Sequence, residues 1–268
     1  MAMIRFHILG AGGAVPTPTH CPAAYWIALD GLGILMDPGP GATVRLVKSG
    51  CADAGVDAID LVLLSHLHPD HSADLVPLLF AAHSPVCKNP EPLQMYGPGG
   101  LKDLLGRLKD IYGSWLEPRS RALEVTEWDI AGPGLELPGG GRITPFPTEH
   151  AQDRLSQQTL GFVLEDGAGK KVVYSGDTGP CAALKDAARG ADVLVVECST
   201  PDELAIAGHL YPAAVAEICR EARPARVILT HQYPAAAEID LAAAVHAHYD
   251  GEVQQARDGD EFTLGAET

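Results

Sequence analysis

The alternation of short apolar runs with amphipathic stretches is the feature of this sequence that most restricts its fold. The runs are four to eight residues long and rich in β-branched side chains, which is typical of buried strands. They lie at 4–9, 24–29, 33–36, 60–65, 121–128, 159–165, 171–175, 192–197 and 226–230. Stretches with helical periodicity lie between them, at 41–49, 72–82, 101–111, 180–189, 212–222 and 239–248. Because both kinds are mixed along the whole length, we expect an α/β fold.

The size and charge of the chain narrow the classes of protein it can belong to. Its 268 residues, 46% of them hydrophobic, are enough for one large core. The Pro- and Gly-rich stretch 131–141 is too short for a linker, so we expect one domain over residues 1–268. No stretch has the ~20 apolar residues that cross a bilayer. A net charge of −16 disfavours a broad nucleic-acid surface, which depends on lysine and arginine.

The cysteines and the N-terminal segment indicate a cellular compartment. The six cysteines are scattered without a C-x-x-C pair, which is typical of reduced thiols rather than of a disulfide framework. Residues 1–13 carry one positive charge and a short apolar run broken by glycines. That pattern predicts a first strand and a turn, not a secretory signal. We therefore expect a cytoplasmic protein.

Four of the strand-like runs end at a side chain suited to chemistry. These side chains are His66, Asp177, Glu197 and His231. In open α/β sheets, ligands usually bind at the carboxyl ends of parallel strands. The four positions are therefore expected to converge on one site.

The strongest motif is H-x-H-x-D-H, formed by His66, His68, Asp70 and His71. On an extended segment, two histidines at i and i+2 point to the same side, and a turn at Pro69 can bring the other two beside them. Imidazole nitrogen and carboxylate oxygen are good zinc ligands. Four such groups exceed what one catalytic zinc needs, which favours two metals. A polar turn with surface histidines is the alternative, and the buried strand directly before the motif argues against it.

Further ligands must come from other parts of the chain. His150 follows a strand-like segment, Asp177 lies where a strand stops between glycines, and His231 ends the run 226–230. Each one alone is more often an ordinary hydrogen-bonded polar group. Together with the six-residue motif they supply the missing ligands of a two-metal site.

These motifs resemble those of the metallo-β-lactamase superfamily, and the resemblance covers nearly the whole chain. The segments that are similar to the ribonuclease Z and arylsulfatase-like branch lie at 6–18, 34–41, 96–100, 197–200 and 208–210. The resemblance implies a four-layered αββα sandwich with two zinc ions at one edge. It also implies that His66, His68 and His150 bind one zinc, that Asp70, His71 and His231 bind the other, and that Asp177 bridges both.

Two positions separate this chain from other branches of the superfamily. True β-lactamases with a three-histidine site have a cysteine at the position of Asp177, and they are secreted, so antibiotic hydrolysis is not expected. Iron-binding members usually have a glutamate at the position of His68. The histidine favours zinc, with manganese or iron as alternatives.

Three more residues are candidates for roles around the metals. In the related branch, a glutamate like Glu197 holds a histidine like His209, which faces the substrate. A carboxylate on one ring nitrogen raises the pKa of an imidazole, so that the other nitrogen can donate a proton. The alternative is that His209 only caps a helix. Asp37 is expected to be a turn carboxylate that caps the helix from residue 41. The resemblance suggests that it also supports the metal ligands, and the two roles are compatible.

The resemblance implies a hydrolase in which two metals generate a bound hydroxide at neutral pH. Asp70 would orient that hydroxide, and His209 would protonate the leaving group. We expect a small phosphodiester or a related ester, such as a cyclic nucleotide or an aryl sulfate, as the substrate. Ribonuclease Z enzymes carry a long arm that grips tRNA, and the 26 residues 151–176 leave no room for one. Precursor tRNA is therefore not expected as the substrate.

Two other functions stay open at this point. A glyoxalase II-like thioester hydrolase would share the metal motif but not the pair Glu197 and His209. A non-enzymatic, metal-stabilised scaffold is the least favoured, because every ligand position is filled. The resemblance also suggests a homodimer.

Overall fold

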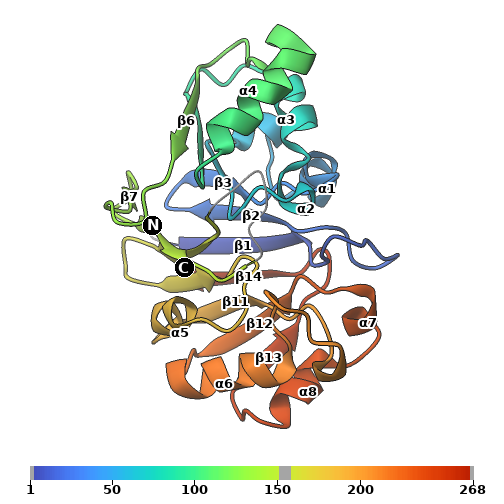
Figure 1. Ribbon diagram of the computed structural model, residues 1–268. Helices are drawn as coiled ribbons and strands as arrows, with labels where there is room; N and C mark the ends of the chain where they lie inside the picture. Colours follow the sequence, from blue (N-terminus) through green and yellow to red (C-terminus); the bar gives the residue numbers. More distant parts are fainter. Residues whose placement is uncertain (1–2, 151–157, 266–268) are drawn as a thin grey trace.

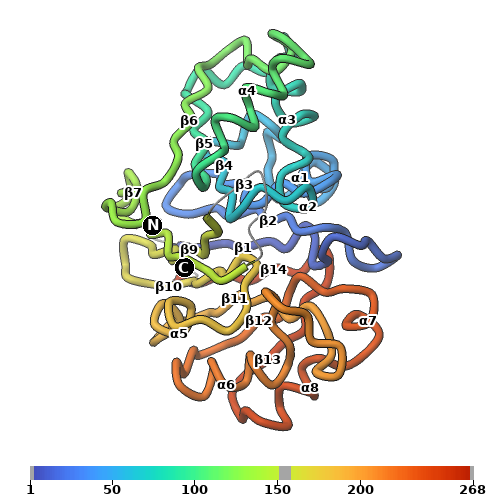
Figure 2. The backbone as a smooth tube through the Cα atoms, in the orientation of Figure 1, coloured from blue at the N-terminus to red at the C-terminus, as the bar shows by residue number. Residues whose placement is uncertain are grey.

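Four layers make up the molecule, which is a computed structural model that describes residues 3–150 and 158–265. Two β-sheets pack face to face, and helices cover the outer face of each sheet (Figure 1). The path of the backbone in Figure 2 shows the N-terminal half on one side of the sandwich and most of the C-terminal half on the other. The expected αββα sandwich is confirmed.

The first sheet comes mainly from the N-terminal half. Its order is β14-β1-β2-β3-β4-β5-β6, with β3 to β6 parallel and the first three strands antiparallel to their neighbours. The bounds are Met3–Gly10 (β1), Ala24–Leu29 (β2), Leu32–Met36 (β3), Leu61–Leu63 (β4), Leu93–Gly97 (β5), Leu123–Glu127 (β6) and Glu261–Gly265 (β14). Three helices cover its outer face, namely α1 (Ala42–Ser49), α3 (Leu75–Ala82) and α4 (Leu101–Tyr112).

The second sheet has the order β13-β12-β11-β10-β9-β8-β7, and its strands β10 to β13 are parallel. The bounds are Leu135–Glu136 (β7), Arg142–Pro147 (β8), Leu160–Glu165 (β9), Lys171–Tyr174 (β10), Val193–Glu197 (β11), Arg226–Thr230 (β12) and Glu252–Gln255 (β13). The helices α5 (Ala182–Ala188), α6 (Pro212–Ala222) and α8 (Leu241–His246) cover it. The short α7 (Pro234–Ala237) follows β12, and short 3₁₀ helices lie at Gly55–Ala58, Gly113–Leu116 and Asp202–Leu204.

Side chains from alternate positions of the two sheets form the central core, as the period of two along a strand requires. Phe6 and Phe262 stack with ring centroids 5.1 Å apart, and Tyr25 of one sheet meets Tyr174 of the other at 5.0 Å. Phe6, Tyr25 and Tyr174 are almost completely buried, and each such ring contributes on the order of 1.5–3 kcal/mol from burial alone. The central core therefore fixes the two sheets against each other, including the ends of their strands.

The expected helix over 72–82 is wrong in its start, because the structure has two helices there. The short α2 (Pro69–Ser72) begins with proline at its first position, and α3 starts only at Leu75. Between them, the Asp74 amide donates to the carbonyl of Pro38 at 3.0 Å instead of continuing the helical ladder. The motif histidine His71 is thereby held on a single turn.

Strands β5, β7, β8, β13 and β14 lie outside the runs that the apolar pattern singled out. Several of them have exposed or half-buried residues between buried ones, so they lack a continuous apolar run. No helix formed by the described residues combines the length and the apolar character needed to cross a membrane.

The parallel strands bring their carboxyl ends to one edge of the sandwich. Strands β10, β11 and β12 lie side by side in register, and β4 of the other sheet ends just before the histidine motif. The strand ends predicted to converge do so at this edge.

Candidate metal centre

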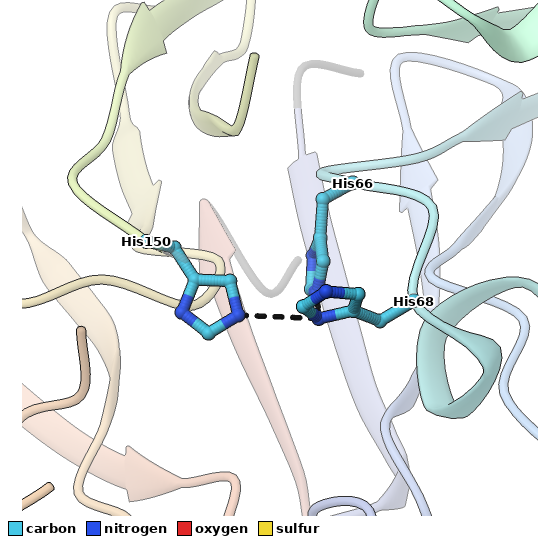
Figure 3. A group of neighbouring side chains, drawn as sticks. All are labelled: His66, His68 and His150. Atoms are coloured by element: carbon cyan, nitrogen blue, oxygen red, sulfur yellow. Dashed lines mark hydrogen bonds between the residues drawn. The ribbon is translucent and has the colours of Figure 1, made fainter. Parts of the chain in front are cut away.

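The first group of potential ligands consists of His66, His68 and His150 (Figure 3). The first two follow β4, and His150 comes from the segment after β8. Nε2 of His66 lies 3.1 Å from Nδ1 of His68, and Nε2 of His150 lies 3.2 Å from that same Nδ1. Three ring nitrogens thus point into one small space from both sheets.

The second group consists of Asp70, His71, Asp177 and His231, all of them buried. Nε2 of His71 and Nε2 of His231 face each other at 3.1 Å. Oδ2 of Asp70 lies 3.4 Å from Nε2 of His231 and 3.7 Å from Nε2 of His71. Two carboxylates and two imidazoles therefore surround a second space.

Asp177 lies between the two groups. Its Oδ2 is 3.2 Å from Nε2 of His231, and it is also 3.8 Å from Nε2 of His66 and 3.9 Å from Nε2 of His150. Its Oδ1 lies 3.3 Å from Nε2 of His71, yet it is buried and accepts no hydrogen bond from any described residue. A buried carboxylate oxygen without a donor is unfavourable unless a cation compensates it.

The donor atoms fit divalent metal ions in spacing and in chemistry. Neighbouring ligands of a tetrahedral zinc with bonds of about 2.0–2.1 Å are about 3.3 Å apart. The distances between the donors here run from 3.1 to 3.9 Å. Two imidazole nitrogens at 3.1 Å cannot both present lone pairs unless a proton or a metal lies between them. The arrangement can hold two ions with a shared carboxylate.

Groups behind the ligands fix the orientation of four of the histidine rings. In each ring, Nδ1 bonds to the protein and leaves Nε2 for the centre, which is the usual arrangement around metal-binding histidines. The partners are Ser65 Oγ for His66 at 3.0 Å, Asp37 Oδ2 for His71 at 2.9 Å, the Gly208 carbonyl for His150 at 2.8 Å and Ser199 Oγ for His231 at 3.0 Å.

Asp37 supports the ligands and does not cap a helix. Its Oδ2 accepts hydrogen bonds from Ser65 Oγ at 2.6 Å and from Tyr174 at 2.7 Å, besides its contact with His71. Its backbone takes φ of 47°, a strained value for a non-glycine residue. The start of α1 is instead held by the carboxylate of Asp74. Of the two compatible roles that we expected for Asp37, the helix cap is wrong.

The charges at the centre are strongly coupled. Burial lowers the pKa of His66, and the neighbouring imidazoles lower it further. Burial also disfavours a charged His71, but the carboxylates of Asp177, Asp37 and Asp70 outweigh it and raise the pKa of His71 well above its usual value. Burial opposes ionisation of Asp70, yet the histidines beside it hold its pKa far below the usual range. These carboxylates therefore stay ionised, which metal binding would require.

Glu197 and His209 form a pair beside both groups. Nδ1 of His209 lies 3.0 Å from Oε2 of Glu197, which also accepts hydrogen bonds from Ser199 Oγ and the Leu210 amide. The ring of His209 stacks with that of His231 at 5.6 Å. Burial disfavours its charged form, but the bond to Glu197 dominates and raises the pKa of His209 to about 9. Its Nε2 has no hydrogen-bond partner among the described residues, and His209 lies with His150 and Asp177 in one group whose ligand atoms are within 4.8 Å of one another, so Nε2 can act as an acid there.

Sequence reasoning missed four residues at this site, namely Ser65, Tyr174, Ser199 and Tyr233. The serines could have been found, because one precedes the motif and the other follows Glu197 by two positions. The tyrosines give no local signal. Tyr233 packs its ring against His209 at 5.5 Å and His231 at 5.7 Å. Burial, with the carboxylates of the site, raises the pKa of Tyr233 to about 12.

Comparison with known proteins decides the family. The profile of the beta-lactamase superfamily domain matches residues 33–232, which include all the candidate ligands and the pair Glu197 and His209. The chain belongs to the metallo-β-lactamase superfamily. Its relatives place it in the ribonuclease Z-like branch of these metal-dependent hydrolases.

Three similar proteins illustrate this superfamily assignment. An uncharacterised protein of Mycobacterium leprae, ML1173, is 30% identical over 98% of this chain and 89% of its own length. A ribonuclease Z of Mycobacterium sp. strain KMS is 31% identical over 87% of this chain and 85% of its own length. The metallo-β-lactamase fold protein YhfI of Bacillus subtilis has the same fold, with a TM-score of 0.81, 22% identity, and coverage of 98% of this chain and 100% of that one.

Proposed function

We propose that this superfamily member is a zinc-dependent hydrolase with two metal ions that acts on a small phosphodiester. The observation that carries the proposal is the pairing of two ligand groups through Asp177, with the Glu197–His209 pair beside them. The residues that would hold one ion are His66, His68 and His150, those for the other are Asp70, His71 and His231, and Asp177 would serve both.

Asp70, Glu197 and His209 would have different roles around the metals. Bound divalent ions supply an activated water and neutralise charge on the substrate oxygens. Asp70, which could serve as both ligand and hydrogen-bond acceptor, would orient the attacking water. Glu197 fixes the tautomer of His209 and keeps it protonated at neutral pH, so His209 gives its proton to the departing oxygen.

The proton donor favours an oxygen ester over a thioester. A thiol has a pKa of about 8.5, so a thiolate leaves readily without a proton. An alkoxide is far more basic and needs protonation as the bond breaks. A buried imidazole that Glu197 keeps protonated therefore helps an alkoxide to leave and helps a thiolate little. This argument speaks against the glyoxalase II-like alternative.

Processing of the tRNA 3′ end is the second candidate, and the relatives named ribonuclease Z favour it. The segment between His150 and Asp177 argues against it. Its described part, 158–176, consists mainly of β9, β10 and the turn 166–170 that joins them, and it contains no long arm. The net charge of −16 also leaves few partners for phosphates. We therefore rank tRNA below a small ester.

The test is a substrate panel run on the purified, zinc-loaded protein with its metal content measured. The panel comprises bis-p-nitrophenyl phosphate, an aryl sulfate, a thioester and precursor tRNA. The proposal expects turnover of the phosphodiester above the others and close to two metal ions per chain. Specific cleavage of precursor tRNA, or a preference for the thioester, would replace the proposal with that alternative. A content of one ion or less per chain would contradict the proposal that the site holds two metal ions.

A further inference from the structure

The side chain at position 233 stands at the metal centre without a role in the function proposed above. Tyr233 is two residues beyond the ligand His231, at the point where the chain leaves β12. Its ring contacts those of His209 and His231, with centroids 5.5 Å and 5.7 Å away. The phenol thus stands beside the proton donor and beside one metal ligand.

The backbone that carries Tyr233 is fixed on both sides. Its amide donates to the carbonyl of Ser199 at 3.0 Å, and proline at the next position starts α7. The preceding Gln232 is fully buried, with its amide bonded to the Ala11 carbonyl and its side chain to the Ala256 carbonyl. Since such a segment has little freedom, the ring is preorganised rather than mobile.

The N-terminal loop is shaped to accommodate this ring. A Cβ atom at Gly13 would lie 2.4 Å from Cε1 of Tyr233 and 2.9 Å from Cε1 of His231. Such distances are shorter than any carbon contact, so no other residue fits at position 13 without moving the site. The glycine lets one edge of the phenol pack against the backbone.

The hydroxyl of Tyr233 has no hydrogen-bond partner among residues 3–150 and 158–265. Buried or half-buried tyrosines usually find one. Cε1 of the phenol, which is bonded to the carbon that carries the hydroxyl, and Cε1 of His231, which is bonded to Nε2, lie 2.4 Å and 2.9 Å from the same point, the Cβ position at Gly13. The hydroxyl end of the ring therefore lies beside the space that the potential ligands surround. A phenol is a donor at neutral pH, and a donor in that space has an anionic substrate oxygen as its natural acceptor.

We propose that Tyr233 binds the substrate by donating a hydrogen bond to a non-bridging oxygen of its phosphoryl group. The inference rests on the proposed phosphodiesterase function and narrows it. It assigns the site to esters whose central atom carries a free oxyanion beside the scissile bond. Tyr233 would then form, with His209, the polar wall opposite the metals.

The first test compares Tyr233→Phe with the wild type in the affinity of the zinc-loaded protein for inorganic phosphate, measured by calorimetry. Loss of a hydrogen bond to a charged oxygen predicts about 10- to 100-fold weaker binding, with zinc content unchanged. Tyr112→Phe, at the exposed end of α4, is the matched control and should bind as the wild type does. Unchanged phosphate affinity in Tyr233→Phe would overturn the inference.

A second test separates a direct contact from an effect through the histidine. Tyr233→Phe keeps the ring that packs on His209, and Tyr233→Leu removes it. If the phenol only supports the ring of His209, the Phe variant keeps the wild-type phosphate affinity and the Leu variant alone is impaired, which contradicts the inference. A direct contact predicts that Tyr233→Phe still weakens phosphate binding in a His209→Ala background.

These binding measurements also distinguish failure of the inference from failure of the function. Zinc-loaded wild type that binds phosphate through Tyr233 but hydrolyses no phosphodiester leaves the contact intact and overturns the proposed reaction. If the zinc-loaded wild type hydrolyses the diester and Tyr233→Phe binds phosphate as tightly as the wild type, the proposed reaction stands and the contact from Tyr233 is overturned.

Discussion

The two ligand groups differ in charge and in exposure, although they share Asp177. The first offers three imidazoles and no carboxylate of its own, and His68 is partly exposed. The second offers the carboxylates of Asp70 and Asp177 with two imidazoles, all buried, and a third carboxylate, Asp37, stands behind His71. Carboxylates in a low-dielectric site attract a divalent cation far more strongly than imidazoles do. The two positions of one centre are therefore unequal, and the first should exchange its ion more readily.

The largest expected effect comes from removing what the two groups share. Asp177→Ala should lower the affinity of both positions, since its Oδ2 faces His66 and His150 as well as His231. Because the ions supply several kcal/mol of transition-state stabilisation, turnover should fall by at least about 10³-fold. Elemental analysis after reconstitution checks this. Retention of one ion at native affinity would show that the carboxylate belongs to one group alone.

His209→Ala should leave both groups loaded and still stop most of the chemistry. His209 contacts a ligand of each group but is not needed to complete either. Loss of a general acid predicts a rate decrease of roughly 10²–10⁴-fold, largest for esters with poor leaving groups. Zinc is measured in the same samples. If this variant loses zinc, His209 is itself a ligand.

The pH dependence of turnover is a second test of the role of His209. The pKa of His209 is raised to about 9, so the acid is present below that pH and is lost as the pH rises through it. Turnover of an unactivated diester should therefore decline on the alkaline side as the pH rises through about 9, and Glu197→Gln should move that decline to lower pH. If the pH dependence of turnover is the same in Glu197→Gln as in the wild type, Glu197 does not raise the pKa of His209.

A smaller effect should separate the two groups from each other. Asp37→Asn removes the charge behind His71 and keeps an amide in a backbone conformation that asparagine tolerates. Its expected cost is about 10- to 100-fold in affinity at the second position, with a smaller loss at the first, because Ser65 bonds to both Asp37 and His66. His68→Ala is the matched variant for the first position. Chelator competition followed by metal analysis should show a different ion weakened most in each variant, and equal loss of both ions in either would make the groups inseparable.

The smallest effect should come from the loop beside the second group. Gly13→Ala places a methyl group against Tyr233 and His231, and such overpacking usually costs about 1–3 kcal/mol. We expect a lower melting temperature and a turnover reduced several-fold. Gly99→Ala is the control, because its Cβ meets nothing within 4 Å. Equal melting temperatures of Gly13→Ala and Gly99→Ala would show that the loop around Gly13 moves to accommodate the methyl group at little cost.

The sequence predicted those parts of the fold and the site that are encoded locally. Helix α6 and strand β12 lie where the patterns put them, and the H-x-H-x-D-H motif follows a buried strand as expected. What it could not supply depends on contacts across the sandwich. Asp37 and Tyr174 are 137 positions apart, and no periodicity relates them. Asp74 likewise holds the start of α1, a helix that lies before it in the chain.

The position of the ligands relative to the two sheets has a consequence beyond catalysis. One half of the sandwich provides His66, His68, Asp70 and His71, and the other provides His150, Asp177 and His231. An ion held between them fastens the halves together, so its binding free energy adds to the stability of the folded chain. A molecule deprived of metal opens more often and exposes itself to proteases, whose cleavage follows the population of open forms. The lifetime of this protein in a cell would then depend on the concentration of available metal ions.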